Sequence, residues 1–333
     1  MVNGEVVALI GSDSLLGREI RDIVSTSSPR FTLRLIVGGD EQAGTLTRVG
    51  DEAAIVGNLD PESVAGAQAV FLAGSPESSQ KALGLIAGSA PVIDLTHAAE
   101  EHPHARLRAP LVEEEPIEDG ADVYVIAHPA SVALALLLRR LQAHHPVHRS
   151  VVQILAPASE RGTAGLEELQ QQTVNLLSFK SVPHAIFDTQ LSFNLLARYG
   201  EEAPVKLEES ELRIERHLAS LLAFPGDGEG APMPSLRVIQ APVFHGYSFS
   251  VWIEFESNPG VETLESILAE GKIDVRGPDL EPPTIVGQAG QDGIAVGAIE
   301  PDRNNAEACW FWMVVDNLRV TAQNAVALAE QIL

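Results

Sequence analysis

The 333-residue chain has a single cysteine, Cys309, so no disulfide can form within it. Basic residues are also scarce: 22 Lys and Arg stand against 46 Asp and Glu, and the formal net charge is −24 at pH 7. A surface of this sign repels phosphate backbones and anionic lipids. We therefore expect neither a nucleic acid nor a membrane as a partner.

Long hydrophobic runs are missing as well. The apolar run that begins at Ser131 is interrupted by Arg139 and Arg140, too early for it to span a bilayer. The first residues, MVNGEVVALIGS, lack the basic flank and the cleavage site of a signal peptide. The sequence therefore predicts a soluble protein of the cytoplasm.

What the sequence does contain is a series of short apolar segments separated by stretches of helix length. These segments are residues 6–10, 69–73, 91–95 and 123–127. Continuous apolar strands that alternate with helices are typical of a parallel sheet covered on both faces. The sequence predicts an α/β fold whose first domain, residues 1–130, is a Rossmann-like, doubly wound domain.

The second half has a different pattern, with longer strand-like segments and interleaved helices. The expected strands are residues 151–155, 236–244 and 247–256, and the expected helices are 165–177 and 208–222. This pattern favours an α+β domain for substrate binding or dimerisation over residues 131–315. The last residues, 316–333, have helical periodicity, and we expect them to return to the first domain.

A glycine-containing turn follows the first expected strand, in the place where a dinucleotide-binding turn would lie. Its residues are Gly11, Ser12, Asp13, Ser14, Leu15 and Gly17. Gly11 and Gly17 permit the tight turn and close helix–strand packing. However, Ser14 narrows the approach of a phosphate, and Asp13 adds a carboxylate beside it. Two interpretations stay open: a dinucleotide site, or a bare turn in a Rossmann-like domain.

Five segments, in order along the chain, are similar to segments of aspartate-semialdehyde dehydrogenases. The first is the glycine turn. The others are APASERGTAGLEEL (156–169), SFNLL (192–196), APVFHGYS (241–248) and DNLR (316–319), which resemble the family's Q-A-A-S-G-A-G-x-x-G-x-x-E-L, A-F-N-V-I-P, V-P-V-x-x-G-H-S and D-N-L-R-K-G-A-A.

The chain is therefore identified as a member of this family, whose enzymes reduce aspartyl phosphate to its semialdehyde with a nicotinamide cofactor. The resemblance implies NADP or NAD as the cofactor, with Ser159, Gly162 and Asn317 beside it. It also implies a homodimer formed through the sheet of the second domain.

Three positions that carry the family's chemistry differ in this chain. Ser131 replaces the Cys of N-P-N-C, and a hydroxyl is a poorer nucleophile than a thiol at neutral pH. Tyr247 replaces the His of G-H-S, and a phenol with a pKa of about 10 cannot shuttle protons as an imidazole does. Gln240 replaces the Arg that clamps the substrate carboxylate. The pattern resembles the cysteine-less, Usg-type branch of the family.

Other interpretations of these positions follow from the residues alone. Ser131 is predicted to be a first-turn or N-cap residue of a helix rather than a nucleophile. His245 lies two residues before Tyr247, and on a strand the two would share a face. His245 is therefore either a compensating catalytic group or an ordinary, partly buried histidine. We expect no metal site, because Pro146 separates His144 and His145 from His148.

These observations predict a homologue of aspartate-semialdehyde dehydrogenase that does not catalyse that reaction. We expect weak binding of NADP or NAD, because Asp13 and Glu160 would oppose the pyrophosphate. The alternative is an active NAD(P)-dependent oxidoreductase for another aldehyde or ketone, in which Tyr247 or His245 would donate the proton.

Overall fold

We describe the protein from a computed structural model, which describes residues 5–38, 43–50, 52–86, 88, 90–113, 120–224, 230–269 and 272–333. The chain divides into two compact units, Met1–Ala127 with Leu318–Leu333 and His128–Asn317. The sequence-based limits at residues 130 and 316 fall a few residues from these. Among the residues described, no helix combines the length and apolar composition needed to cross a membrane.

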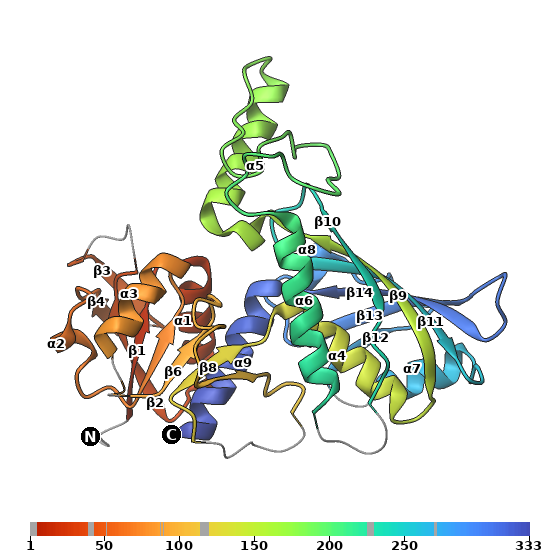
Figure 1. Ribbon diagram of the computed structural model, residues 1–333, viewed down its shortest axis with the longest axis horizontal. Helices are drawn as coiled ribbons and strands as arrows, with labels where there is room; N and C mark the ends of the chain where they lie inside the picture. The colour runs from red at the N-terminus through yellow and green to blue at the C-terminus, as the bar shows by residue number, and fades with distance from the viewer. Residues whose placement is uncertain are drawn as a thin grey trace. The chain divides into compact units, whose positions relative to one another are not determined.

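The first unit contains a sheet of six parallel strands in the order β2-β1-β5-β6-β8-β7 (Figure 1). The strands are β1 (Glu5–Ile10), β2 (Phe31–Ile36), β5 (Ala69–Leu72), β6 (Val92–Asp94), β7 (Ala105–Arg108) and β8 (Val123–Ile126). The helices are α1 (Leu15–Ser27), α2 (Pro61–Val64), α3 (Pro76–Ile86) and α9 (Asn317–Ile332). Two further strands, β3 (Leu46–Val49) and β4 (Glu52–Ile55), form a separate antiparallel ribbon.

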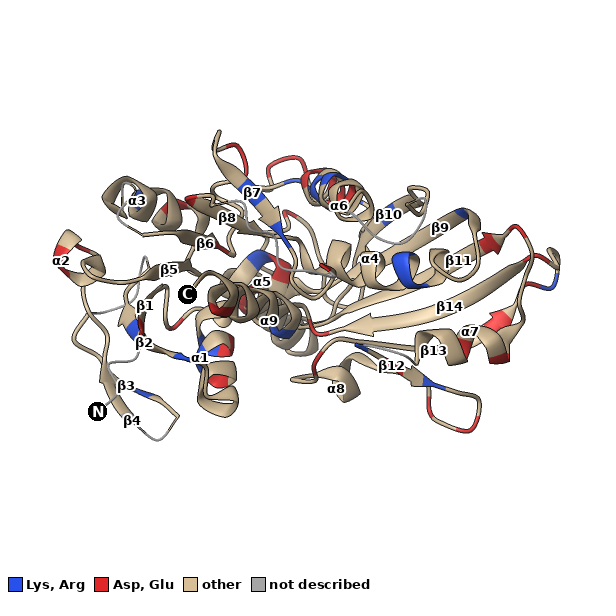
Figure 2. Cartoon of the chain, turned by 90° about the horizontal axis from the view of Figure 1, so that it is seen from below, with Lys and Arg blue, Asp and Glu red and all other residues tan. Residues whose placement is uncertain are grey.

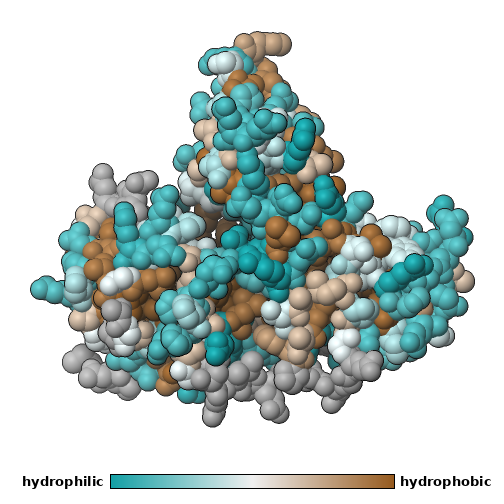
Figure 3. Space-filling view, viewed as in Figure 1, coloured by the Kyte–Doolittle hydropathy of each residue, from teal (hydrophilic) through white to brown (hydrophobic). Residues whose placement is uncertain are grey.

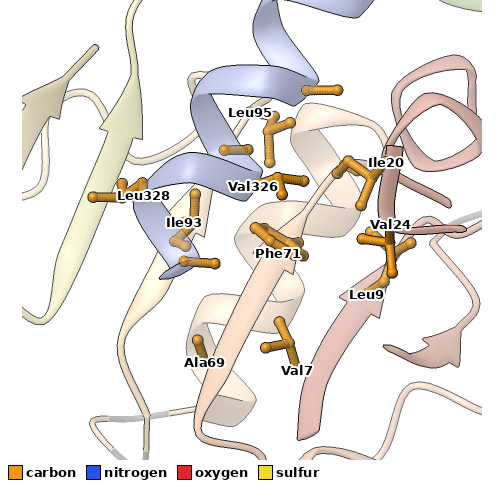
Figure 4. Close-up of a cluster of buried hydrophobic side chains, with 14 of the residues drawn as sticks. Val7, Leu9, Ile20, Val24, Ala69, Phe71, Ile93, Leu95, Val326 and Leu328 are labelled. Atoms are coloured by element: carbon orange, nitrogen blue, oxygen red, sulfur yellow. The ribbon is translucent and has the colours of Figure 1, made fainter. Parts of the chain in front are cut away.

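Helices cover both faces of this sheet, which explains why its central strands are apolar throughout. On one face, α1 and α9 pack on the strands, with Val326 and Leu328 of α9 near Phe71 and Ile93 (Figure 4). On the other face, α2 and α3 bury a second cluster that includes Ala82. Each fully buried Leu, Ile or Phe side chain contributes about 1.5–3 kcal/mol. The doubly wound Rossmann-like domain is therefore confirmed, and the C-terminal helix α9 packs on its sheet.

The second unit contains a mixed sheet in the order β10-β9-β11-β14-β13-β12. The strands are β9 (Val147–Ala156), β10 (Ser235–Gln240), β11 (Tyr247–Phe255), β12 (Ile273–Arg276), β13 (Ile294–Pro301) and β14 (Ala308–Val315). The helices are α4 (Pro129–Gln142), the 3-10 turn η1 (Ala158–Arg161), α5 (Gly162–Leu177), α6 (Leu207–Leu222), α7 (Val261–Leu268) and α8 (Ile285–Gln288). The α+β character expected for this half of the chain is confirmed.

The two faces of this mixed sheet differ in burial. Along β11, Phe249, Val251 and Ile253 are fully buried on the face that carries α4 and α7. The alternating residues face the other way, so Trp252 lies opposite Trp310 of β14. Figure 2 shows that β14 carries no charged residue along its whole length.

The helix α5 forms an arm of the second unit that ends in apolar side chains. Val174, Leu177 and Phe179 are exposed at its C-terminal end. Apolar surface is visible on this arm in the space-filling view (Figure 3). Its base is held to the following loop by the buried Glu168, whose carboxylate accepts the backbone N–H groups of Ile186 and Phe187.

Candidate functional site

The glycine turn of the first unit connects β1 to α1, and its two glycines lie against neighbouring backbone atoms. Gly11 has a φ of +85°, and a Cβ added to it would lie 2.3 Å from the backbone nitrogen of Gly74. A Cβ on Gly17 would lie 2.1 Å from the carbonyl oxygen of Gly11. Side chains are thus excluded at both positions, as the dinucleotide-type turn requires.

The hydroxyl of Ser14 closes this turn. Ser14 is the N-cap of α1: its Oγ accepts the N–H of Gly17 at 2.9 Å and donates to the carbonyl of Ala73 at 2.5 Å. Leu15 begins the helix. Ser14 therefore acts first as a capping residue, a role for which serine is among the preferred residues.

The charge of Asp13 is paired within the turn. Its Oδ1 lies 2.8 Å from Nη1 of Arg21, a residue of α1. The neighbouring Ser12 is fully buried, and its hydroxyl has no hydrogen-bond partner among the residues described. The turn therefore offers a buried, unpaired hydroxyl and a carboxylate whose charge is balanced.

Two of the three residues implied by the family resemblance, Ser159 and Asn317, meet in the second unit. Asn317 accepts the N–H of Gly246 at 2.9 Å, and its amide nitrogen donates to the hydroxyl of Ser159 at 3.1 Å. Gly162, at the end of η1, has a φ of +63° and open space around the position of a Cβ. Asn317 and Ser159 thus hold the turn before β11 against η1.

Ser131 lies in the first turn of α4 and is fully buried. Its Oγ donates a hydrogen bond of 2.9 Å to the carbonyl of Ile214 in α6. This bond ties two packed helices together and uses the hydroxyl proton. The arrangement matches the helix-residue interpretation of Ser131, whose hydroxyl has a backbone carbonyl, and no basic side chain among the residues described, as its hydrogen-bond partner.

Tyr247 is also fully buried, at the start of β11. Its hydroxyl donates to Oε2 of Glu160, whose other oxygen, Oε1, lies 3.0 Å from Nε2 of His128. The rings of His128 and Tyr247 meet edge to face at 5.8 Å. Burial, together with the Glu160 carboxylate, raises the pKa of Tyr247 well above its ordinary value.

A second group of contacts begins at Arg161, beside Glu160 in η1. Its Nη2 donates to Ser210 in α6 at 2.7 Å, and its guanidinium stacks over the ring of Tyr199 at 5.4 Å. The hydroxyl of Tyr199 donates to Oε1 of the buried Gln240 at 2.6 Å. Gln240, at the end of β10, donates in turn to the carbonyl of Ala156 at 2.9 Å. The structure therefore brings Gln240 and Tyr247 into neighbouring parts of one buried polar region.

His245 does not share a face with Tyr247, contrary to the expectation from strand geometry. β11 begins only at Tyr247, and Gly246 turns the backbone before it with a φ of +83°. His245 is exposed on that turn, whereas Tyr247 is buried. Partial burial lowers the pKa of His245 despite the nearby Asp316. The positive φ of Gly246 is what separates the two side chains.

The expected direction of Glu160 was also wrong. The sequence placed its carboxylate against a bound pyrophosphate, whereas the structure directs it to Tyr247 and His128. Sequence reasoning missed His128 and Arg161 as members of this polar region. The signal available was the segment Ser159–Gly162, where two charged residues stand in the place of the family's small Gly and Ala.

The architecture defines a two-domain protein with a Rossmann-like unit and a mixed-sheet unit. The family model "Semialdehyde dehydrogenase, dimerisation domain" matches residues 138–320. The chain belongs to the semialdehyde dehydrogenase family.

Curated relatives match over nearly the whole chain. An aspartate-semialdehyde dehydrogenase of Rickettsia bellii is 27% identical over 98% of this chain and 97% of its own. A USG-1 protein homolog of Pseudomonas aeruginosa is 29% identical over 97% of this chain and 96% of its own. The chain is therefore similar both to an aspartate-semialdehyde dehydrogenase and to a USG-1 protein homolog.

Solved structures agree with the fold. A probable aspartate-semialdehyde dehydrogenase from Pseudomonas aeruginosa has a TM-score of 0.82 at 26% identity and covers 98% of each chain. The aspartate semialdehyde dehydrogenase from Candida albicans, solved with NADP, has a TM-score of 0.66 at 15% identity, covering 99% of this chain and 98% of its own. The second likeness concerns the fold alone.

Proposed function

We propose that this chain is a homologue of aspartate-semialdehyde dehydrogenase that does not interconvert aspartate semialdehyde and aspartyl phosphate. The observation that carries the proposal is the commitment of Ser131 and Tyr247 to buried hydrogen bonds. Ser131 has a backbone carbonyl as its acceptor and no base to activate it, and Tyr247 is a weaker acid than an ordinary phenol. Neither group is suited to replace a thiolate or an imidazole.

The test is phosphate-dependent reduction of NADP by aspartate semialdehyde, followed by NADPH absorbance. We expect no turnover above background, because loss of one member of a cooperating catalytic unit removes several orders of magnitude in rate. A relative with the family's Cys and His, assayed in parallel, is the control. Turnover within tenfold of that enzyme would refute the proposal.

A nicotinamide dinucleotide fits the first unit, which supports residual binding. Gly11 and Gly17 allow the tight, closely packed turn of a dinucleotide-binding unit, and the N–H groups at the start of α1 attract an anion. The buried hydroxyl of Ser12 lacks a partner among the described residues and could donate to a phosphate oxygen. Bound NADP or NAD would supply a hydride donor or acceptor.

We also propose that NADP and NAD bind weakly, because of the Ser14 side chain. Arg21 balances the charge of Asp13, so the remaining obstacle is the Ser14 side chain inside the turn. Calorimetric titration with NADP and NAD should give dissociation constants above roughly 100 μM, equivalent to less than about 5.5 kcal/mol. Submicromolar binding would show that Ser14 does not obstruct the cofactor.

The intact turn is also the observation that favours the alternative, an oxidoreductase for another aldehyde or ketone. Its difficulty is the proton donor: the hydroxyl of Tyr247 already donates a hydrogen bond to Glu160, and His245 lies on an exposed turn. Turnover on any aldehyde, with a clear preference for NADP or NAD, would establish this alternative.

The proposal includes a homodimer in the cytoplasm. Support for the dimer comes from the match to a dimerisation domain and from the apolar face of the mixed sheet. The proposed cytoplasmic location rests on the sequence, which lacks the features of a signal peptide and an apolar run long enough to span a bilayer.

A further inference from the structure

The carboxylate of Glu160 meets donors from two different elements of the second unit. The hydroxyl of Tyr247, at the start of β11, donates to Oε2. Nε2 of His128, at the N-cap of α4, lies 3.0 Å from Oε1. Arg161, the next residue in η1, adds a guanidinium whose charge lowers the pKa of Glu160. These groups form a closed receptor for one carboxylate.

The hydrogen bonds of His128 fix which of its nitrogens carries the proton. The N–H of Ala130 points to Nδ1 at 3.2 Å, so Nδ1 is an acceptor. A neutral imidazole then carries its proton on Nε2, which faces Glu160. The neutral His128 ring therefore donates its Nε2–H to the carboxylate.

The receptor is rigid and nearly shut off from solvent. The side chains of His128 and Glu160 are 1% and 12% exposed, and Tyr247 is fully buried. Burial alone would raise the pKa of Glu160, but the contacts with His128 and Tyr247, together with the charge of Arg161, outweigh it and hold the pKa well below its usual range. Donors preorganised in this way favour a charged carboxylate strongly over a neutral group.

We propose that His128 and Tyr247 form a carboxylate-binding site, which the chain's own Glu160 occupies as an internal ligand. The site is intrinsically able to bind a small external carboxylate but is closed to it while Glu160 is present. A tethered group competes at an effective concentration above the millimolar values of flexible linkers, so millimolar external carboxylate displaces little of it. The inference does not depend on whether the chain binds a dinucleotide.

Acetate is a matched probe for the vacated site. The substitution Glu160→Ala removes Cγ, Cδ and the two carboxylate oxygens, and acetate supplies the same four heavy atoms. We expect the variant to be less stable than the unmodified chain and to recover stability when sodium acetate is added. At ten times the dissociation constant, the midpoint of thermal unfolding should rise by roughly 2–4 °C relative to sodium chloride of equal ionic strength.

Three comparisons separate this effect from a general salt effect. The unmodified chain and Glu160→Gln should show no difference between acetate and chloride, because a side chain fills the site in both. Glu167→Ala removes an exposed acid from the neighbouring α5 and should behave like the unmodified chain. The proposal is overturned if folded Glu160→Ala responds equally to acetate and chloride, or if the filled variants respond as it does.

A second measurement covers the case in which Glu160→Ala does not fold. Carbon-13 NMR of the glutamate carboxyls in the unmodified chain should show one group that stays ionised well below the ordinary pKa of about 4.3. The substitution Tyr247→Phe should shift the pKa of that same group upward, because it removes one donor. Titration of every glutamate near the ordinary value would contradict the receptor.

Discussion

At the scale of single residues, the positions that the sequence resemblance assigns to the family's chemistry are buried, hydrogen-bonded polar groups. Ser131, Gln240 and Tyr247 each have a defined partner within the second unit. A buried polar group that loses its partner costs about 1–3 kcal/mol. Replacing one of these residues by the family's residue would therefore disturb a hydrogen bond without rebuilding the missing site.

The substitution Ser131→Cys is expected to give an unreactive thiol. The position is fully buried, so the thiolate would be poorly solvated and its pKa would rise. With Ellman's reagent, the native variant should release no more thiolate than the unmodified chain. The native Cys309 should contribute little to the signal of the native protein, because it is buried and burial raises the pKa of its thiol.

Ser178→Cys, on the exposed end of α5, serves as the matched control and should react at once. Both variants should react fully after denaturation. Rapid reaction of native Ser131→Cys, or activity with aspartate semialdehyde, would mean that the residue is accessible and activated.

The depressed pKa of Glu160 predicts a particular pH dependence of stability. A carboxyl with a folded-state pKa below its unfolded value stabilises the protein at neutral pH, and this stabilisation is lost as pH falls below about 4.3 towards the folded value. Glu160→Gln should therefore lower the free energy of unfolding by about 1–3 kcal/mol at pH 7. The difference from the unmodified chain should shrink in acid.

Urea unfolding between neutral and acidic pH measures this difference. Tyr247→Phe should lose stability at a higher pH than the unmodified chain, since it keeps the carboxylate but removes a donor. A constant difference between Glu160→Gln and the unmodified chain at every pH would be inconsistent with a stabilised charge on Glu160.

At the scale of elements, the glycine turn shows how close packing restricts a single backbone position. In Gly17→Ala the new Cβ would lie 2.1 Å from the carbonyl oxygen of Gly11, so the turn must move. We expect the first unit to lose more stability than the typical point mutation, which costs about 1 kcal/mol. Chemical denaturation followed by circular dichroism would measure this loss.

Gly84→Ala provides the control within the same unit. Gly84 lies in α3, and a Cβ there would meet nothing within 4 Å. In a helix interior, alanine is favoured over glycine by roughly 0.5–1 kcal/mol, so this variant should be slightly more stable. Equal effects of the two substitutions would show that the turn is not tightly packed.

The strands differ in how well the sequence predicted them. The buried strands β1, β5 and β8 are continuous apolar runs, because helices cover both of their faces. β7, at the edge of the sheet, has the sequence ARLR, which does not read as a buried strand: Arg106 is exposed, and Arg108 is buried in an ion pair with Glu113. Local patterns of this kind do not report which faces are covered.

The polar region around Glu160 lay beyond sequence reasoning for a different reason. His128, Glu160 and Tyr247 are 32 to 119 residues apart, and only the tertiary fold brings them together. The family resemblance identified the position of Tyr247 but not its partner. The exposed position of His245 depended on one positive φ at Gly246, which the assumed strand did not contain.

At the scale of the whole molecule, the charge limits where two copies can meet. A net charge of −24 makes copies repel each other over most of their surface. The face of the mixed sheet opposite α4 and α7 carries all three tryptophans of the chain: Trp252 is opposite Trp310 on β14 and Trp312 is opposite Ser250. Arg149 lies over the ring of Trp252 and Trp312 donates to the carbonyl of Pro283, so Trp310 is the most exposed of the three. Val151 on β9 adds to this face and is 45% exposed.

We therefore expect a homodimer that depends on this tryptophan face. Light scattering at micromolar concentration should give twice the chain mass of 35.5 kDa. Trp310, which is 44% exposed, is the position to change: Trp310→Asp would place a charge in an apolar interface and, by symmetry, on both copies. This variant should run as a folded monomer.

Leu46→Asp is the control: it changes a 71% exposed leucine on β3 of the first unit and should leave the dimer intact. A monomeric unmodified chain, or a Trp310→Asp variant that remains dimeric, would exclude this face as the interface and leave the exposed tryptophan without an explanation.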